Sequence, residues 1–213
     1  MPKARVSHPI FARIYGWASP KTDANGLAVY RRRLLAGLCG TVIEVGAGNG
    51  LNFAHYPPEV SRVLAVEPEP HLRTLAERAA AQAPVSVEVI DGDAERLPIG
   101  DATFDAAVAS LMLCSVRDPA KALREMRRVV RPGGQLRVFE HVRADTPALG
   151  RVQRLLDATI WPAACGGCHL HRDTTAAIER AGFTIERLDR IHYPESGVSW
   201  PASPCILGVA TRP

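Results

Sequence analysis

The sequence lacks the features that mark several large classes of protein. Its longest apolar run, about residues 106–114, is far shorter than the roughly 20 residues that cross a bilayer. No internal repeat, low-complexity tract or secretory signal is visible. Aromatic residues make up only 6% of the chain, which argues against the basic and aromatic stripe typical of nucleic-acid binding. We therefore expect a cytoplasmic protein that binds no nucleic acid and does not insert stably into a membrane.

Cysteine is scarce and odd in number, with Cys39, Cys114, Cys165, Cys168 and Cys205. A chain of this size needs no disulfides, so we expect reduced thiols. The stretch "CGGCHLH" at 165–171 contains possible metal ligands. Four ligands within seven residues would be crowded, because zinc sites usually combine two separated halves. We therefore predict no metal, and a glycine-flexible loop in its place.

Lysine is also rare: 23 of the 26 basic residues are arginine. The net charge is +4, and the clusters Arg31–Arg33 and Arg127–Arg128 both stand in probable helical text. We interpret these clusters as solvent-exposed helix faces. With 46% apolar and 23% charged residues, the 213-residue chain is typical of one globular domain.

The chain alternates between β-branched runs and helical periodicity. Strands are predicted at 41–45, 62–68, 85–93, 104–110, 135–142, 184–193 and 205–211, and helices at 25–38, 70–83 and 118–134, with a short helix after Gly50 and interrupted helical text before Gly182. This order indicates a Rossmann-like α/β fold, with helices on both faces of a mostly parallel seven-stranded sheet. The last two strands have no helix between them, so we expect an antiparallel C-terminal hairpin.

Three glycines follow the first strand in "TVIEVGAGNGLNF", at Gly46, Gly48 and Gly50. A dinucleotide loop would place its third glycine or alanine at position 51, where this chain has leucine. Acids end the first three strands, at Glu44, Glu67 and Asp93. Such acids would repel a pyrophosphate, whereas a carboxylate at Glu67 can accept both hydroxyls of a ribose. S-adenosylmethionine carries a ribose, an adenine and a sulfonium but no phosphate, and we expect it as the cofactor.

The ordered motifs "EVGAGNG", "VEPEP", "GDAERLP", "FDAAVASLMLCSV" and "REMRRVVRPGG" resemble those of class I S-adenosylmethionine-dependent methyltransferases (methyltransferase type 11) over about residues 38–142. The stretches "LCSVRD", "FEHV", "RLLDATIWP" and "GGCHLHRDT" resemble more narrowly the methyltransferase-like 7 group of thiol S-methyltransferases and its bacterial relatives. The animal members carry an N-terminal membrane anchor, which we do not find here. The resemblance implies one domain over 1–213, with an N-terminal helical lid (1–38), a cofactor-binding core (39–142), and substrate-covering helices with the closing hairpin (143–213).

The resemblance and the strand ends together give candidate cofactor-binding residues: Tyr15, Glu44, Gly46, Ala47, Gly48, Gly50, Glu67, Pro68, Asp93, Ala94 and Ser110. Asp93 and Ala94 are expected at the adenine, and Ser110 at the methionine part. Tyr15 is expected on a lid, although packing of its amphipathic segment on the core is an equal alternative.

His141 ends the fifth strand and is the candidate catalytic base, because a neutral imidazole there can take a proton from an attacking acceptor. A purely structural histidine is the alternative. We expect Trp161, Cys168 and His169, in the insertion 146–173, to bind the substrate.

The sequence thus predicts a small-molecule methyltransferase, with a hydrophobic thiol as the expected acceptor. Open alternatives are an oxygen or nitrogen acceptor of secondary metabolism and a phospholipid amine. An NAD-binding oxidoreductase is a remote alternative, since no hydride-transfer site is evident.

Overall fold

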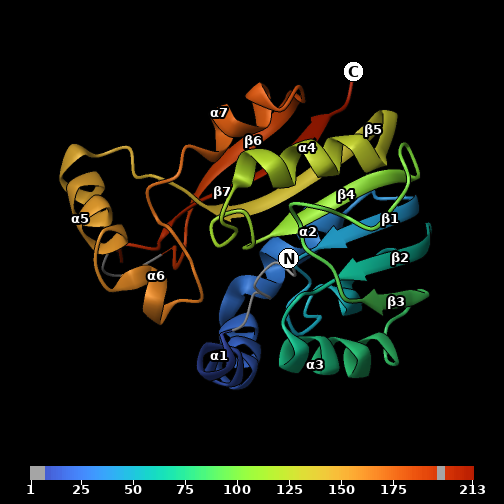
Figure 1. Cartoon of the computed structure of the whole chain (residues 1–213), viewed down its shortest axis with the longest axis horizontal. Helices are drawn as coiled ribbons and strands as arrows, with labels where there is room; N and C mark the ends of the chain where they lie inside the picture. Colours follow the sequence, from blue (N-terminus) through green and yellow to red (C-terminus); the bar gives the residue numbers. More distant parts are fainter. Residues whose placement is uncertain (1–7, 196–199) are drawn as a thin grey trace, which may run out of the picture.

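The computed structural model describes residues 8–195 and 200–213. Its helices are α1 (Pro9–Thr22), α2 (Ala28–Leu35), α3 (Pro70–Ala80), α4 (Pro119–Val129), α5 (Pro147–Asp157), α6 (Trp161–Ala164) and α7 (Thr174–Arg180). Its strands are β1 (Gly40–Val45), β2 (Val60–Val66), β3 (Val87–Ile90), β4 (Phe104–Ser110), β5 (Val130–His141), β6 (Thr184–His192) and β7 (Pro204–Thr211). Figure 1 shows the sheet between layers of helices.

The seven strands form one sheet in the order β3-β2-β1-β4-β5-β7-β6. Strands β1 to β5 pair in parallel, whereas β7 runs antiparallel to both β5 and β6. The predicted Rossmann-like fold and its antiparallel closing pair are therefore confirmed. The strand order reverses between β1 and β4, which is the point where ligands bind in open α/β sheets.

The two faces of the sheet bury separate apolar clusters, because successive strand side chains point to opposite sides. Ile43 and Val45 of β1 pack on the face that carries Leu123 of α4 and Ile178 of α7. Val42, the residue before Ile43, points to the opposite side and packs on the face that carries α2 and α3. Helices thus cover both faces, as the alternating sequence pattern predicts (Figure 1).

Three element boundaries differ from the sequence-based expectation. Helix α4 ends at Val129, and the Pro-Gly-Gly at 132–134 lies inside a long β5, where the register to β4 shifts. After Gly50 there is only a 3-10 turn, Phe53–His55. The helix expected over 25–38 begins as a π-turn, Asp23–Leu27, where Asn25 and Gly26 leave helical angles and connect α1 to α2 at a kink.

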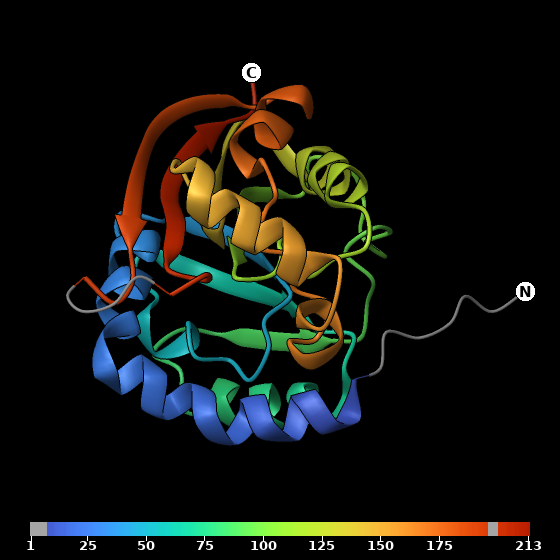
Figure 2. The same cartoon turned by 90° about the vertical axis from the view of Figure 1, so that its left-hand side faces the viewer.

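Helix α1 extends along one side of the molecule, next to α3 (Figure 2). Gly16 permits this contact, since a Cβ there would lie 2.7 Å from a Leu75 methyl carbon. The buried Ser19 hydroxyl accepts a hydrogen bond from Asn49 Nδ2 at 3.0 Å, which joins α1 to the loop after β1. Among the described residues, no helix is both long and apolar enough to span a membrane.

Candidate active site

Two cavities adjoin at the carboxyl ends of the parallel strands. The larger has a volume of about 600 Å³ and follows the loops after β1, β2, β3 and β4. The smaller, about 340 Å³, lies between α1, the end of β5 and the start of β7. Tyr15, Arg31 and Leu111 line both cavities and therefore mark their junction.

Most of the predicted cofactor residues meet at the larger cavity. Its lining includes Tyr15, Glu44, Gly46, Ala47, Gly48, Glu67, Pro68, Asp93, Ala94 and Ser110. Gly50 does not line it. A Cβ at Gly50 would lie 2.8 Å from the Phe53 ring and 2.9 Å from Ala79, so this glycine serves close packing beneath the loop. The structure thus places Gly50 outside the lining of this cavity, and its contact with the cofactor stays a prediction.

Glu67 connects the ends of β1 and β2. Its carboxylate accepts the backbone N–H of Gly48 at 2.7 Å on Oε2 and that of Glu69 at 2.9 Å on Oε1. Burial raises the pKa of Glu67 to about 7, against the lowering effect of these two hydrogen bonds. Each carboxylate oxygen accepts one bond, so each keeps a further lone pair for a ligand hydroxyl. This geometry fits the bidentate ribose contact expected of Glu67.

Glu44 lines the larger cavity and is 1% exposed. Its oxygens accept hydrogen bonds from Asn52 Nδ2 at 2.8 Å and from the Tyr56 hydroxyl at 2.7 Å. Burial raises the pKa of Glu44 to about 7. The side chain is therefore held in an internal network, and its effect on a ligand is mainly electrostatic.

Asp93 and Ala94 follow β3 and line the larger cavity. Asp93 Oδ1 accepts the backbone N–H of Glu95 at 2.9 Å, and Arg117 Nη2 lies 3.3 Å from Oδ2. Ala94 is buried beside this carboxylate and offers an apolar surface. A polar edge beside an apolar surface is the combination that a planar base requires.

Arg31 is the residue that the sequence interpretation missed. The cluster Arg31–Arg33 was expected to face solvent, but Arg31 is 4% exposed, because α2 turns it inward together with Leu34 and Leu35. Its Nε is paired with Asp23 Oδ1 at 2.6 Å, and its Nη1 donates to Asn52 Oδ1 at 2.9 Å and to Ser110 Oγ at 3.3 Å. A fixed guanidinium here offers a binding group for a carboxylate.

The charges around the larger cavity fit S-adenosylmethionine better than a phosphate ligand. Carboxylates line it at Glu44, Glu67, Glu69, Asp93 and Glu95, whereas the arginines that line it are Arg31 and Arg117. Arg117 is engaged with Asp93 and Glu95. A ligand with two cationic centres and one carboxylate matches this distribution, since the carboxylates line most of the cavity and the guanidinium of Arg31 lies at the junction. The side chain that Gly48 lacks would fill space next to Tyr15, 3.6 Å from its ring.

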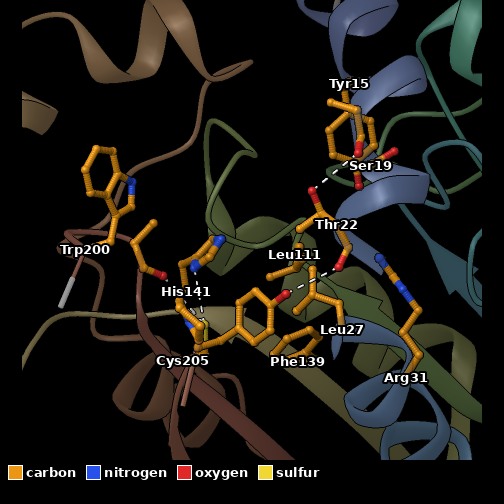
Figure 3. A pocket seen from close by; sticks show the side chains of 14 residues that line it. Tyr15, Ser19, Thr22, Leu27, Arg31, Leu111, Phe139, His141, Trp200 and Cys205 are labelled. Atoms are coloured by element: carbon orange, nitrogen blue, oxygen red, sulfur yellow. Dashed lines mark hydrogen bonds between the residues drawn. The ribbon is translucent and has the colours of Figure 1, made fainter. Parts of the chain in front are cut away.

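The smaller cavity has a different character (Figure 3). Its lining is largely apolar and aromatic, with Leu27, Leu111, Phe139, Tyr193, Pro194, Trp200 and Ala202 among its members. None of the described residues that line it is acidic, and Arg31 at the junction is its one cationic side chain. Such a lining favours an uncharged ligand, because a buried charge without a partner is costly.

His141 lies in the wall of the smaller cavity and pairs in register with Cys205 of β7. Its Nδ1 is 3.3 Å from Cys205 Sγ, while the opposite edge of the ring is turned toward the centre of the cavity (Figure 3). Burial lowers the pKa of His141 to about 4. The imidazole is therefore neutral at physiological pH and can accept a proton, although it is a weak base.

Tyr15 and Leu111 form the junction with Arg31. Tyr15 stacks on Phe11, with ring centroids 5.4 Å apart, and Phe11 packs against Gly166, so α1 meets the segment after α6 above the larger cavity. Leu111 has a left-handed backbone with φ of 57°, which is strained for a branched residue. Strain of this kind is found at functional sites, and here it is located at the contact between the cavities.

Two of the predicted substrate residues lie elsewhere. Trp161 and Cys168 line neither cavity but pack with Cys114 and Leu170 in a separate apolar cluster, because the insertion folds back on the loop after β4. The amide of His169 donates to the Cys114 carbonyl at 2.8 Å and holds this arrangement. His169 itself lines the larger cavity. Within residues 8–195 and 200–213, no group of three or more histidine, cysteine or acidic side chains could hold a metal ion.

Comparison with known proteins agrees with this geometry. Residues 43–138 match the family described as "Methyltransferase domain". The chain is 34% identical over 179 residues to "Thiol S-methyltransferase TMT1B" of Rattus norvegicus, covering 81% of this chain and 70% of that protein. It is 35% identical over 112 residues to a demethylmenaquinone methyltransferase of Thermobifida fusca, covering 52% and 48% of the two chains. The solved structure of a SAM-dependent methyltransferase from Thermotoga maritima has the same fold, with a TM-score of 0.67, 20% identity and coverage of 95% and 100%.

Proposed function

The chain belongs to the S-adenosylmethionine-dependent methyltransferases, and from that premise we propose that it methylates the sulfur of a small, uncharged, apolar thiol. One observation carries the proposal: an apolar cavity with a neutral histidine in its wall opens beside the acidic cofactor cavity. The similarity to proteins named thiol S-methyltransferases supports the same acceptor.

The residues proposed to hold the cofactor divide by its chemical parts. Glu67 would accept the ribose hydroxyls, and Asp93 with Ala94 would receive the adenine. Arg31 would bind the carboxylate at the junction of the cavities, beside Ser110. When bound, S-adenosylmethionine supplies an electrophilic methyl group on a sulfonium sulfur. The contribution of the protein is then to hold an acceptor atom in line with that group and to exclude water.

The weak basicity of His141 favours sulfur over oxygen. A thiol has a pKa of about 8.5 and is already partly ionised near neutral pH, so a weak base at the right place is sufficient. An alcohol is far less acidic and requires a stronger base. With a pKa of about 4, His141 can take the proton of a thiol as the thiolate is consumed, but is poorly suited to an alcohol.

The charge distribution argues against an amine acceptor. Aliphatic amines are cationic at neutral pH and would have to lose a proton before reacting. None of the described lining residues of the smaller cavity is acidic, so nothing there would bind the cation. The nearby positive charge of Arg31 would disfavour it further.

A matched series of acceptors tests the proposal: phenylmethanethiol, benzyl alcohol and benzylamine, which share one apolar group. Release of S-adenosylhomocysteine is measured, and the methylated product is identified by mass spectrometry. We expect methyl phenylmethyl sulfide as the main product and little product from the other two. Comparable turnover of the alcohol would reject the thiol and indicate an O-methyltransferase instead.

A further inference from the structure

His141 and Cys205 lie side by side on the adjacent strands β5 and β7. They are paired in the antiparallel register of β5 and β7, which brings the two side chains to the same face. Cys205 Sγ lies 3.3 Å from His141 Nδ1. Cys205 is 2% exposed and lines the smaller cavity beside the imidazole. The Cys205 thiol is therefore fixed next to the proposed base by the pairing of the strands. The roles proposed so far for methyl transfer do not include this thiol.

A third group fixes the direction of the hydrogen bonds. The carbonyl oxygen of Ala202 lies 3.8 Å from Cys205 Sγ, and it also raises the pKa of the His141 imidazole against the larger lowering effect of burial. A carbonyl can only accept, so both the S–H and a ring N–H find an acceptor there. If the thiol proton points to Ala202, the sulfur presents only lone pairs to Nδ1, and Nδ1 must carry the proton between them.

The loop that holds this carbonyl is tied on both sides. Trp200 N donates to Ser203 Oγ at 3.0 Å, and Ser203 N donates to the Trp200 carbonyl at 2.9 Å. Gln153 of α5, which is fully buried, donates from Nε2 to the Pro201 carbonyl at 2.9 Å. The Ala202 oxygen is thus preorganised, and it does not depend on a ligand for its position.

The position of the imidazole proton decides whether His141 presents a hydrogen-bond donor or an acceptor to the cavity. With the proton on Nδ1, the lone pair is on Nε2, at the edge of the ring turned toward the cavity (Figure 3). With the proton on Nε2, the cavity would face a donor, and His141 could not accept a proton from an acceptor. One neutral ring thus has one productive tautomer and one unproductive tautomer.

We propose that Cys205 is a positioning residue: together with the Ala202 carbonyl it keeps the proton of neutral His141 on Nδ1, so that the Nε2 lone pair faces the acceptor. The importance of that lone pair for transfer rests on the proposed function, whereas the tautomer itself does not. Burial raises the pKa of the Cys205 thiol to about 12, so the S–H donor is present throughout the working pH range.

The tautomer can be measured directly by nitrogen NMR of protein labelled in histidine, without any substrate. His141→Gln identifies the His141 signals. We expect the wild-type protein to show protonated Nδ1 and unprotonated Nε2. Cys205→Ala should raise the population of the Nε2–H tautomer by roughly two- to tenfold, the shift that one neutral hydrogen bond can supply. Cys205→Ser should restore the wild-type signals, because its hydroxyl donates and accepts at the same place.

Two further variants complete the test. Cys205→Val fills the volume of the thiol without a donor or acceptor, and it should behave as Cys205→Ala if the alanine variant does not fold. Cys39→Ala is the matched control, because Cys39 is exposed at the other end of the sheet from this pair. An Nε2–H tautomer in the wild-type protein, or unchanged signals in both Cys205→Ala and Cys205→Val, would overturn the proposal.

Kinetics then separate this role from the proposed function. Thiol methylation by Cys205→Ala should fall in proportion to the loss of the Nδ1–H population that the NMR signals report, with recovery in Cys205→Ser. Failure of the wild-type enzyme to methylate thiols would reject the acceptor but leave the NMR result standing. A lost tautomer preference with unchanged thiol methylation would show instead that Cys205 does not act on the reaction through His141.

Discussion

The two cavities share three residues but differ in chemistry. The larger is lined by five carboxylates and backbone groups of the loop after β1, whereas the described lining of the smaller has no carboxylate and one neutral histidine. The larger arises at the ends of parallel strands, where backbone N–H groups and strand-end acids collect. The smaller is assembled from α1, the end of β5 and the loop before β7. The difference shows that cofactor and acceptor recognition are built from separate parts of the chain.

The largest effect should come from removing the proposed base in the smaller cavity. His141→Ala should slow thiol methylation by about 10²-fold at neutral pH, the low end of general-base effects, because the pKa of about 4 makes His141 a weak base. Since His141 is neutral above about pH 5, the wild-type enzyme gains nothing more from it as pH rises. The loss should therefore shrink as pH passes the pKa of the thiol, whose thiolate then forms unaided.

Measured rates from pH 6 to 10, with cofactor affinity determined in parallel, provide the check. Cofactor affinity should be unchanged, because His141 does not line the larger cavity. A loss of rate that is the same at every pH would assign His141 a structural role only.

A substitution of Glu67 tests the larger cavity, where we expect the cofactor to bind. Loss of a charge-assisted hydrogen bond costs about 1.5–3 kcal/mol, so Glu67→Ala should weaken binding of S-adenosylhomocysteine at least roughly tenfold. The Michaelis constant for the thiol should change little. Isothermal titration calorimetry measures the affinity, and Glu88→Ala, at the exposed position of β3, is the control. Equal affinity of Glu67→Ala and wild type would contradict the ribose assignment.

Arg31 stands at the junction, and a matched pair of arginines isolates its effect. Arg31→Lys keeps the charge but loses the planar fork, and should reduce cofactor affinity by about tenfold. Arg33→Lys alters an exposed pair with Asp189 and a contact with the Tyr30 ring, neither of them at the larger cavity, and should leave affinity unchanged. Thermal unfolding of both variants shows whether either change acts through stability. Equal changes of cofactor affinity in Arg31→Lys and Arg33→Lys would contradict a contact between Arg31 and the cofactor.

A pair of glycines gives the smallest expected effect. Gly48 and Gly37 both have left-handed backbones, with φ of 59° and 75°, so alanine at either should cost about 1–2 kcal/mol of folding free energy. Around Gly37 a Cβ would meet nothing within 4 Å, whereas Gly48 lines the larger cavity. Both variants should have a lower melting temperature than the wild type. Only Gly48→Ala should also bind the cofactor more weakly, by a few fold. Equal cofactor affinity in the two would contradict a close approach to Gly48.

The sequence predicts the larger cavity better than the smaller for physical reasons. Strand-end positions follow from local periodicity, so Glu67 and Asp93 could be placed before the structure. Arg31 could not be placed from the sequence, because the packing of α2 decides which of its sides is buried. Three consecutive arginines do not indicate which of them faces inward. Trp161 and Cys168 could not either, because the insertion has no period that fixes which of its side chains face a cavity.

The smaller cavity could not be predicted from the sequence, for a related reason. Its described lining comes from residues 15–31, 111, 139–141, 193–194 and 200–205, which approach one another only when β7 inserts between β5 and β6. His141 was found because it ends a strand, whereas the pairing of His141 with Cys205 required the register of the antiparallel strands. Local signals give strand ends, and only the completed sheet gives contacts between them.

Ala18→Phe tests the division of labour most directly, because Ala18 lines the smaller cavity and not the larger. One preparation is used to measure S-adenosylhomocysteine affinity by calorimetry and the rate of phenylmethanethiol methylation. We predict unchanged cofactor affinity and a rate reduced by roughly tenfold or more, since the phenyl ring occupies the acceptor space and overfilling costs about 1–3 kcal/mol. Weakened cofactor binding together with an unchanged Michaelis constant for the thiol would contradict the account.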